Sequence, residues 1–373
     1  MNAPVLDIRD AVKTFTSNRS LFGAPTIVRA VDGVTLAIED GETFAIVGES
    51  GSGKSTLARM LVRLIDPTSG EIRYQGRDIA TLRPAQMREL RGDLQFIFQD
   101  PFSSLNPRMS VGRIVGEPLE THTDLGATER RAKVAALLAR VGLRPEHAER
   151  YPHEFSGGQR QRIGIARALA SGPSVLIGDE PVSALDLSIQ AQVINLLQDL
   201  KAEFGLTLVI IAHDLAVIRH MSDRVAVMYL GRIVELASAD VLFSEPLHPY
   251  TQALLAAIPE ARRGERSPRH VLRGEMPNPA APPAGCRFHT RCPFADDRCV
   301  AEAPPLADAG AGRQVACHHW TAISASGAAY RPPVPPPMRP ATERRFALYR
   351  DAARLRQPET ERKPAEEKTD ANT

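Results

Sequence analysis

The sequence has little of what would place a protein in a membrane or on a nucleic acid. Its 46 basic and 44 acidic residues leave a net charge of +2, and no run rich in Lys and Arg is interleaved with aromatic residues. No apolar run approaches the roughly 18 residues that span a bilayer, and no basic segment followed by an apolar one stands at the start. We therefore expect a cytosolic protein that binds no nucleic acid and reaches a membrane only through a partner.

Cysteine is also scarce, with four residues among 373. The four are separated by five, six and seventeen residues, unlike the C-x-x-C pairs of common zinc sites. A reducing cytosol disfavours persistent disulfides, so thiols in a Pro-rich segment indicate an iron–sulfur cluster, a zinc ion or unligated buried thiols. The residues concerned are Cys286, Cys292, Cys299 and Cys317, with His289, His318 and His319 as nearby spare ligands.

Residues 48–56 read GESGSGKST and fit the P-loop pattern G-x-x-x-x-G-K-[ST]. A β-prone run precedes this stretch and a run with helical spacing follows it, as a phosphate-binding strand–loop–helix unit requires. Its glycines let backbone N–H groups point at phosphate oxygens, while Lys54 neutralises β/γ charge and Ser55 offers a hydroxyl to magnesium. The pattern predicts an ATP and Mg²⁺ site made by Gly48, Glu49, Ser50, Gly51, Ser52, Gly53, Lys54, Ser55 and Thr56.

Short β-rich runs alternate with helical patterns over residues 5–258, which predicts an α/β domain on a mainly parallel sheet. The clearest expected strands are 43–47, 94–98, 175–178 and 206–212, and the clearest expected helices are 54–64, 127–141, 159–170 and 188–204. The last of these helices carries an apolar stripe typical of a core-facing helix, formed by Ile189, Val193, Leu196, Leu197 and Leu200. The chain shows no internal repeat, which indicates a single ATPase unit.

Composition divides the chain further. Strands are scarce between about 101 and 171, so we predict a helical subdomain inserted into a nucleotide-binding domain of residues 1–258. The shift to Pro, Ala, Arg and Gly after Pro259 predicts a separate small module, 259–325, that holds the four cysteines. Residues 326–373 are Pro-rich and then charged, which predicts a flexible tail that buries too little apolar surface to fold.

Five further features follow the P-loop in a fixed order. They are Gln99 after an apolar strand, the stretch Ser156, Gly157, Gly158 and Gln159, the pair Asp179 and Glu180, then Asp186, and finally His213 after another apolar strand. Over residues 5–258 this order resembles the nucleotide-binding subunit of ABC transporters, with its Q-loop, signature motif, Walker B pair, D-loop and switch histidine. The resemblance implies an ABC-type P-loop fold and ATP hydrolysis.

Transfer of a phosphoryl group to water needs magnesium at the β/γ oxygens and a group that positions and deprotonates the water. Asp179 at a strand end is placed to join Ser55 and Gln99 around magnesium, and Glu180 is the candidate general base. His213 is the candidate for polarising the γ-phosphate and water. Each of these residues has a non-catalytic alternative. Asp179 and Glu180 could form a solvated acidic turn, His213 could cap a helix, and Gln99 could be an ordinary loop amide.

The stretch from Ser156 to Gln159 opens a helix with small residues, which favours a second phosphate-binding loop. The resemblance implies that this loop reaches the γ-phosphate on the opposite subunit of a head-to-tail dimer, with Asp186 at the junction. Phe15 resembles the aromatic residue that stacks on adenine in the family, with Phe22 and a plain strand-edge core residue as alternatives.

Longer runs are similar to the ATPase subunits of oligopeptide/dipeptide importers, which extends the resemblance to about residue 320. These runs are 98–109 (FQDPFSSLNPRM), 151–158 (YPHEFSGG), 246–251 (PLHPYT), 285–289 (GCRFH) and 291–293 (RCP). The resemblance implies an ATPase that energises import of peptides or related small solutes from the cytoplasmic face of the membrane. It also implies a second, different ATPase subunit, two permease subunits and, indirectly, an extracytoplasmic solute-binding protein.

Within that subfamily the run 100–108 looks more like the second of the two ATPases. Related importer ATPases carry a cysteine cluster, which favours a [4Fe–4S] cluster here. The alternative function is a soluble ABC ATPase that acts on nucleic acid or the ribosome. Such proteins usually carry two fused ATPase units or a long coiled-coil insertion, and this sequence has neither.

Overall fold

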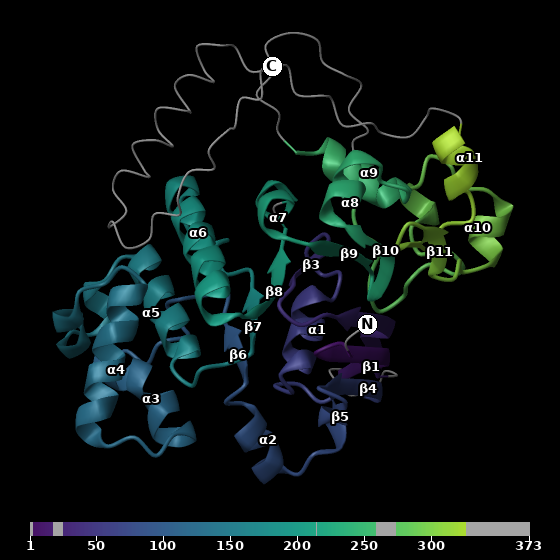
Figure 1. Cartoon of the computed structure of the whole chain (residues 1–373). Helices are drawn as coiled ribbons and strands as arrows, with labels where there is room; N and C mark the ends of the chain where they lie inside the picture. The colour runs from purple at the N-terminus through teal and green to yellow at the C-terminus, as the bar shows by residue number, and fades with distance from the viewer. Residues whose placement is uncertain (1–2, 18–24, 214, 259–273, 326–373) are drawn as a thin grey trace, which may run out of the picture. The chain divides into compact units, whose positions relative to one another are not determined.

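The computed structural model describes residues 3–17, 25–213, 215–258 and 274–325 (Figure 1), which lie in one compact unit within residues 1–332. Phe22 and the tail predicted at 326–373 lie outside the described residues. Among the described helices, none combines the length and hydropathy that crossing a bilayer requires.

The main sheet has eight strands in the order β11-β12-β10-β9-β3-β8-β7-β6. The parallel strands are β3 (Thr43–Val47), β6 (Leu94–Ile97), β7 (Val175–Asp179), β8 (Thr207–Ala212) and β9 (Arg224–Tyr229). The antiparallel strands are β10 (Arg232–Ser238), β12 (Arg313–Val315) and β11 (Ala307–Gly310). Every residue of β3, β7 and β8 is buried, as parallel strands covered on both faces require. The predicted mainly parallel α/β sheet is confirmed.

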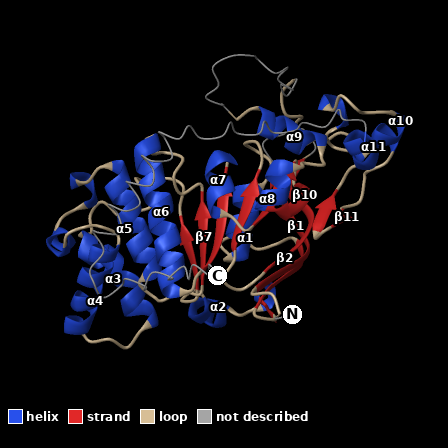
Figure 2. Cartoon of the chain, turned by 45° about the horizontal axis from the view of Figure 1, so that its top comes forward, coloured by secondary structure: helices blue, strands red, loops and turns tan. Residues whose placement is uncertain are grey.

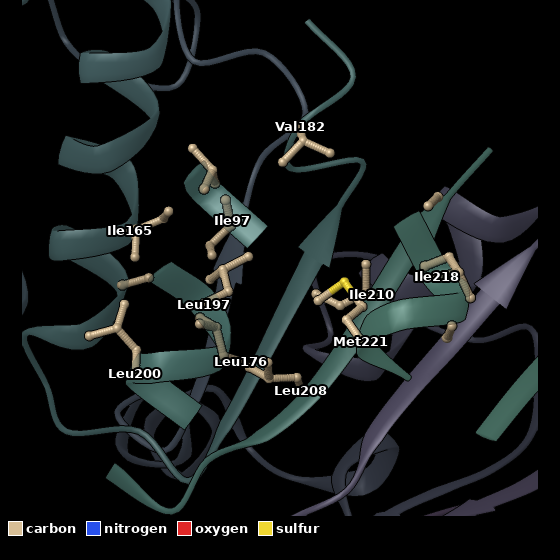
Figure 3. Close-up of a cluster of buried hydrophobic side chains, with 14 of the residues drawn as sticks. Ile97, Ile165, Leu176, Val182, Leu197, Leu200, Leu208, Ile210, Ile218 and Met221 are labelled. Atoms are coloured by element: carbon tan, nitrogen blue, oxygen red, sulfur yellow. The ribbon is translucent and has the colours of Figure 1, made fainter. Parts of the chain in front are cut away.

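Two apolar cores cover the two faces of this sheet, because successive strand residues point to opposite sides. On one face Phe44 and Ile46 of β3 pack with α1 (Lys54–Leu61). Figure 3 shows the other face, where Leu176 and Leu208 from the strands lie near Leu197 of α6 (Leu187–Phe204). The predicted α6 stripe belongs to this core: Val193, Leu197 and Leu200 are buried, and Ile189 and Leu196 are partly buried.

A second, antiparallel sheet lies at the N-terminal side, in the order β2-β1-β4-β5 (Figure 2). Its strands are β1 (Leu6–Ser17), β2 (Thr26–Ile38), β4 (Ser69–Tyr74) and β5 (Arg77–Asp78). The sequence did not single out this sheet, because register shifts between Ile8 and Thr14 interrupt the alternation of apolar and polar residues along β1. Its buried side chains join the same core as α1.

Between β6 and β7 the described residues form helices and no strand. The helices are α3 (Val111–His122), α4 (Ala127–Arg140), α5 (Gly157–Leu169) and the 3-10 turns η2 (Pro145–Glu149) and η3 (Pro152–Glu154). Figure 2 shows α3, α4 and α5 gathered beside α6, and they pack around Leu119, Leu138 and Ile163. The bounds of 101 and 171 for an inserted subdomain stay a prediction.

The remaining helices flank the two sheets. They are the 3-10 turn η1 (Ile79–Thr81), α2 (Pro84–Leu90), α7 (Leu215–Met221), α8 (Ala239–Ser244), α9 (Pro249–Ala256), the 3-10 turn η4 (His289–Arg291), α10 (Asp297–Ala301) and α11 (Trp320–Ala325). All of them except η1 and α2 follow β8 in the sequence. The last three belong to the cysteine-bearing part of the chain.

The bounds predicted for the cysteine-bearing module, 259–325, stay a prediction, and the structure shows how its described residues join the main sheet. The strand β12 pairs with β10, Val315 lying opposite Glu235, so the cysteine-bearing residues extend the main sheet. Phe288 is buried in the same core as α6. We call residues 274–325 the C-terminal module; its small apolar content suffices because main-chain pairing and a shared core hold it in place.

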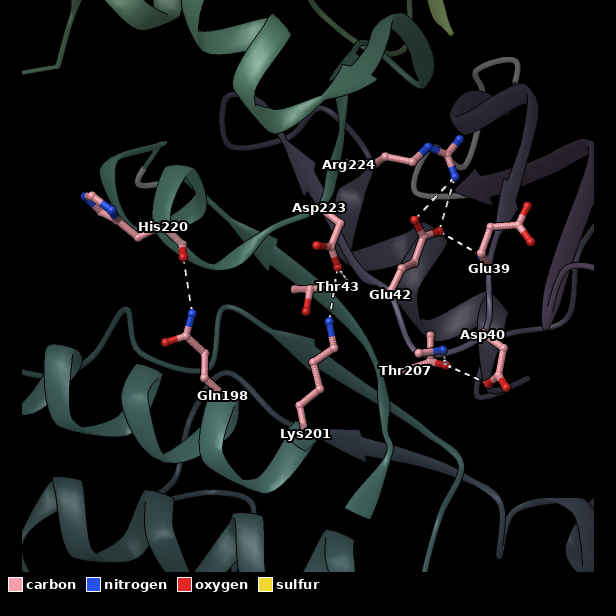
Figure 4. A network of polar contacts seen from close by, with 11 residues as sticks. Glu39, Asp40, Glu42, Thr43, Gln198, Lys201, Thr207, His220, Asp223 and Arg224 are labelled. Atoms are coloured by element: carbon pink, nitrogen blue, oxygen red, sulfur yellow. Dashed lines mark hydrogen bonds and ion pairs between the residues drawn. The ribbon is translucent and has the colours of Figure 1, made fainter. Parts of the chain in front are cut away.

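Polar contacts join strand starts at the sheet edge away from the carboxyl ends (Figure 4). Arg224 at the start of β9 forms an ion pair with the largely buried Glu42 at 3.2 Å. The Asp223 carboxylate accepts a hydrogen bond from the backbone N–H of Thr43 at 2.7 Å and another from Lys201 at 3.1 Å. These contacts fix the start of β3, the strand that leads into the P-loop.

Because Glu235 is fully buried, we expect the stability of the protein to depend on pH. Burial raises its pKa to about 7, although the backbone N–H groups of Leu247 and His248 donate hydrogen bonds to its carboxylate. A carboxyl group whose folded pKa exceeds its unfolded value contributes stability at low pH, and the contribution is lost as pH rises through the folded pKa. The contribution of Glu235 to the free energy of unfolding should therefore fall by about 2–3 kcal/mol between about pH 5 and about pH 8, measured by urea unfolding as the difference between wild type and Glu235→Gln, because the buried His248 titrates in the opposite sense.

The variant Glu235→Gln should flatten that pH dependence. Glu302→Gln is the matched control, because this carboxylate lies in an exposed pair with Arg298. An unchanged pH slope in Glu235→Gln would mean that Glu235 is ionised in the folded protein at pH 5.

Candidate active site

The P-loop joins β3 to α1, and its glycines are required by close backbone contacts. Gly53 has φ 107°, and a Cβ there would overlap the carbonyl oxygen of Ala30. Gly48 has φ 150°, and a Cβ there would overlap the carbonyl oxygen of Met228. The loop therefore fits between β2 and β9 only with glycine at both positions.

Lys54, the first residue of α1, turns its amine back into the loop. Its Nζ donates hydrogen bonds to the carbonyl oxygens of Gly48 and Glu49, each at 2.8 Å. Burial lowers the pKa of Lys54, and the nearby charges of Glu180, Asp179 and Glu49 oppose that shift. The amine is thus held at the mouth of the loop, where a β/γ-phosphate would replace the carbonyl oxygens as its partner.

A cavity of about 250 Å³ opens beside this loop. It is lined by Val28, Arg29, Ala30, Ser50, Gly51, Gly53, Lys54, Ser55, Thr56, Gln99, Glu180, Leu230, Gly231 and Pro279. The cavity brings six of the nine predicted P-loop residues together with Gln99 and Glu180, while Gly48, Glu49 and Ser52 do not line it. A larger cavity of about 630 Å³ lies between the N-terminal sheet and the C-terminal module and contains none of the predicted catalytic side chains.

Ser55 and Asp179 form the pair of oxygens that fits a magnesium ion. The Ser55 Oγ donates to Oδ1 of Asp179 at 2.7 Å, and Arg59 lies 3.5 Å from Oδ2. Asp179 ends β7 and is wholly buried, and burial raises its pKa while Ser55 and Arg59 oppose the rise. A hydroxyl and a carboxylate beside the phosphate loop are ligands that a hard cation prefers.

Glu180 is the meeting point of the three candidate catalytic side chains. Its carboxylate accepts a hydrogen bond from Gln99 Nε2 at 2.8 Å and lies 3.5 Å from Nδ1 of His213. The backbone of Glu180 has φ 47°, which is uncommon for a residue other than glycine, and its N–H donates to the carbonyl of Ile211. Strain of this kind directs the side chain away from the sheet toward the cavity.

The stretch Ser156 to Gln159 and Asp186 do not line this cavity. Ser156 caps α5: its Oγ accepts from the backbone N–H of Gln159, whose side chain accepts from the N–H of Ser156. Gly158 has no room for a side chain, because a Cβ there would crowd Ile189 of α6. The second predicted phosphate loop is therefore a rigid helix start whose role in nucleotide binding stays a prediction.

Phe15 lies on β1 opposite Val28, which lines the cavity, but its own ring is not part of the lining. The ring is 42% exposed, with the Lys13 amine 5.3 Å from its centroid. Contact of Phe15 with adenine stays a prediction.

Among the site residues that the sequence did not predict, three follow the main parallel strands in the chain. Arg291 forms a two-point ion pair with Glu49 of the P-loop, Tyr250 accepts a hydrogen bond from the Glu49 N–H, and Pro279 lines the cavity. Tyr250 and Arg291 stand in runs that mark the importer subfamily. Those runs gave no sign of contact with the P-loop, which is 242 residues from Arg291 along the chain.

The four cysteines are free thiols that line one small pocket together with His248, His289, His318 and His319. Burial, and then the neighbouring thiols, raise the pKa of Cys292 to about 12 and that of Cys317 to about 11. Asp296, Cys299 and His319 also place ligand atoms within 4.8 Å of one another.

Comparisons with protein families give two matches. Residues 31–183 match the family described as ABC transporter. Residues 234–299 match the family described as oligopeptide/dipeptide transporter, C-terminal region, which includes Tyr250, Arg291 and three of the four cysteines.

Individual relatives are similar over most of the chain. The oligopeptide transport ATP-binding protein AppF of Bacillus subtilis is 54% identical over 321 residues, 85% of this chain and 98% of the relative. The dipeptide transport ATP-binding protein DppF of Escherichia coli is 49% identical over 317 residues, 85% and 95% of the two chains. A probable peptide ABC transporter ATP-binding protein of Sinorhizobium fredii is 56% identical over 292 residues, 78% and 83%.

Solved structures share the fold of the nucleotide-binding part. A dimeric post-hydrolysis state of the ATP-binding cassette MJ0796 bound to ADP and Pi has a TM-score of 0.57 and 30% identity, and covers 63% of this chain and 98% of its own. The cbiO1 protein of Clostridium perfringens, part of the ABC transporter complex cbiONQ, has the same score and identity and covers 65% and 92%.

Gly53→Ala should weaken nucleotide binding, because the added methyl group displaces the loop from Ala30. We expect the Kd for a fluorescent ATP analogue to rise by at least about tenfold. Gly76→Ala is the matched control: Gly76 also has positive φ, but a Cβ there meets nothing within 4 Å. The control should lose only about 1 kcal/mol of stability and keep its affinity. Wild-type affinity in Gly53→Ala would contradict the assignment of the loop.

Proposed function

The chain belongs to the ATP-binding subunits of oligopeptide/dipeptide ABC transporters, and on that premise we propose that it hydrolyses ATP to drive peptide uptake through a membrane permease. The family and the ABC fold inferred from the sequence are thereby confirmed. One observation carries the proposed chemistry: Gln99 and His213 both approach the Glu180 carboxylate at the edge of the cavity that Lys54 lines.

Different residues of the site serve different steps of ATP hydrolysis. The P-loop N–H groups and Lys54 bind the phosphates, and Glu180 takes the proton of the attacking water. Gln99 donates its amide hydrogen to Glu180 and so holds the carboxylate in place, while His213 stands beside the same oxygen. Ser55 and Asp179, with Gln99 as a further candidate ligand, would hold magnesium, which would supply charge neutralisation at the β/γ oxygens.

We propose that the working site forms between two subunits. Ser156, Gly157, Gly158 and Gln159 do not line the cavity of their own chain, which supports contact with nucleotide on a partner. Leu187, next to Asp186, is 80% exposed, as suits a residue that becomes covered on association. The MJ0796 cassette, which is similar over the nucleotide-binding part, is dimeric.

The partner in this proposal is a second, different ATPase subunit. The run 100–108, which looks like the second of the two importer ATPases, supports that choice. The pair would sit at the cytoplasmic face of the membrane beneath two permease subunits, with an extracytoplasmic binding protein delivering the solute. Attachment through partners agrees with described helices that cannot span a bilayer.

We propose further that the cysteine pocket holds a [4Fe–4S] cluster. Four free thiols lining one pocket in the absence of any described disulfide fit a four-thiolate centre. When bound, the cluster would supply a covalent staple for the C-terminal module. Zinc at Asp296, Cys299 and His319 is the competing arrangement.

The transport proposal is tested with the protein, its partner ATPase and its permease in liposomes. ATP hydrolysis should rise when a peptide-loaded binding protein is added. Glu180→Gln should still bind ATP but lose hydrolysis by at least about 100-fold and trap the ATP-bound dimer, because no base deprotonates the water. Near-normal hydrolysis would remove Glu180 from its role, and stimulation by nucleic acid or ribosomes instead of peptide would favour a soluble ABC ATPase.

Metal analysis tests the cluster. The protein purified without oxygen should contain about four iron and four acid-labile sulfide per chain and absorb visible light. Cys292→Ser should lose both, whereas Thr290→Ala, an exposed neighbour outside the pocket, should keep them. Stoichiometric zinc, or no metal at all, would overturn the proposal.

A further inference from the structure

A buried ion pair joins the C-terminal module to the P-loop at Glu49. Nη1 of Arg291 lies 2.9 Å from Oε1 of Glu49, and Nη2 lies 3.2 Å from Oε2, so the guanidinium meets the carboxylate at two points. The Arg291 side chain is only 4% exposed and that of Glu49 26%. Planar two-point contacts of this kind are among the strongest and most directional polar contacts in proteins.

The aromatic residues behind this pair hold both partners. The Tyr250 hydroxyl accepts a hydrogen bond from the backbone N–H of Glu49 at 2.8 Å, and the Tyr229 hydroxyl accepts one from Arg291 at 3.4 Å. The two tyrosine rings lie 4.6 Å apart, and Phe288 lies 5.4 Å from each. Because all three rings are buried, Arg291 and Glu49 have little freedom to separate.

The position of Glu49 makes its charge matter for nucleotide binding. The carbonyl oxygen of Glu49 accepts a hydrogen bond from the Lys54 amine at 2.8 Å, and its carboxylate charge acts on that amine. A carboxylate next to the triphosphate site repels the anionic ligand and competes for Lys54. Within the loop, residues 48–56, Lys54 is the one cationic side chain. The charge of the Glu49 carboxylate is therefore neutralised by Arg291, which comes from outside the loop.

We propose that Arg291 is a positioning residue, through which the C-terminal module neutralises Glu49 and holds the P-loop in the shape that binds ATP. The inference rests on the proposed function, because it takes the P-loop cavity as the ATP site. Arg291 acts through Glu49 and touches neither the phosphates nor the water. Its loss should therefore weaken ATP binding while leaving the chemical step nearly unchanged.

A double-mutant cycle tests this in the intact transporter complex, with ATP affinity measured by a fluorescent ATP analogue and KM and kcat by steady-state hydrolysis. Arg291→Gln should raise Kd and KM for ATP by about tenfold and change kcat by less than about threefold, since Glu49 is left charged beside the phosphates. Adding Glu49→Gln should return Kd and KM to within about threefold of wild type, because the uncompensated charge is gone.

Two further variants distinguish an effect of the Arg291 charge on ATP binding from a general effect on the folding of the C-terminal module. Arg291→Lys keeps the charge without the planar fork and should give an intermediate Kd. Arg298→Gln removes another arginine of the same module, one paired with Glu302 at the exposed surface, and should leave Kd unchanged. Thermal unfolding of each complex checks that the module remains folded.

The outcomes are distinct. Rescue of ATP affinity by Glu49→Gln supports the inference. If the double variant binds ATP no better than Arg291→Gln, or if kcat falls while KM holds, Arg291 is structural or has another role and the inference is overturned. A wild-type complex that fails to bind ATP overturns the proposed function as well.

Discussion

Parallel pairing of β3, β8 and β7 determines where the P-loop, Asp179, Glu180 and His213 lie. Val47 at the end of β3 pairs with Ala212 of β8, and Ile211 of β8 pairs with Asp179 of β7. The three strands therefore end at the same level of the sheet, and the residues that follow them meet at one edge. The P-loop, the Asp179 and Glu180 pair, and His213 are brought together by backbone register before any side-chain contact is made.

This constraint explains which parts of the site could be predicted from the sequence. A P-loop and an acidic pair after an apolar strand are local patterns, and the rule that parallel strands share an edge places them together. The strands β3 and β7 and the helix α6 carry uninterrupted patterns, so their positions were predicted to within about one or two residues. Bulges in β1 break its alternation, which is why the antiparallel sheet was missed.

The contact between Glu49 and Arg291 could not be predicted in the same way. The two residues are 242 positions apart in the chain. No local sequence motif around either residue indicates a contact with the other. The change in composition after Pro259 predicted a small module, and the pairing of β12 with β10 joins the described part of that module to the main sheet. A local sequence motif indicates which ligand a loop can bind. The tertiary structure is needed to show which distant residues, here Arg291 and Tyr250, contact the loop and hold its conformation.

The residues that contact Glu49 connect the P-loop with the cysteine pocket, two sites that the sequence analysis considered separately. Arg291 directly precedes Cys292, and Phe288 lies two residues beyond Cys286, so the groups that hold Glu49 are anchored between cysteines of the same pocket. Any free energy that nucleotide binding gains from the Glu49 and Arg291 contact is, by linkage, also gained by the ordered form of the module.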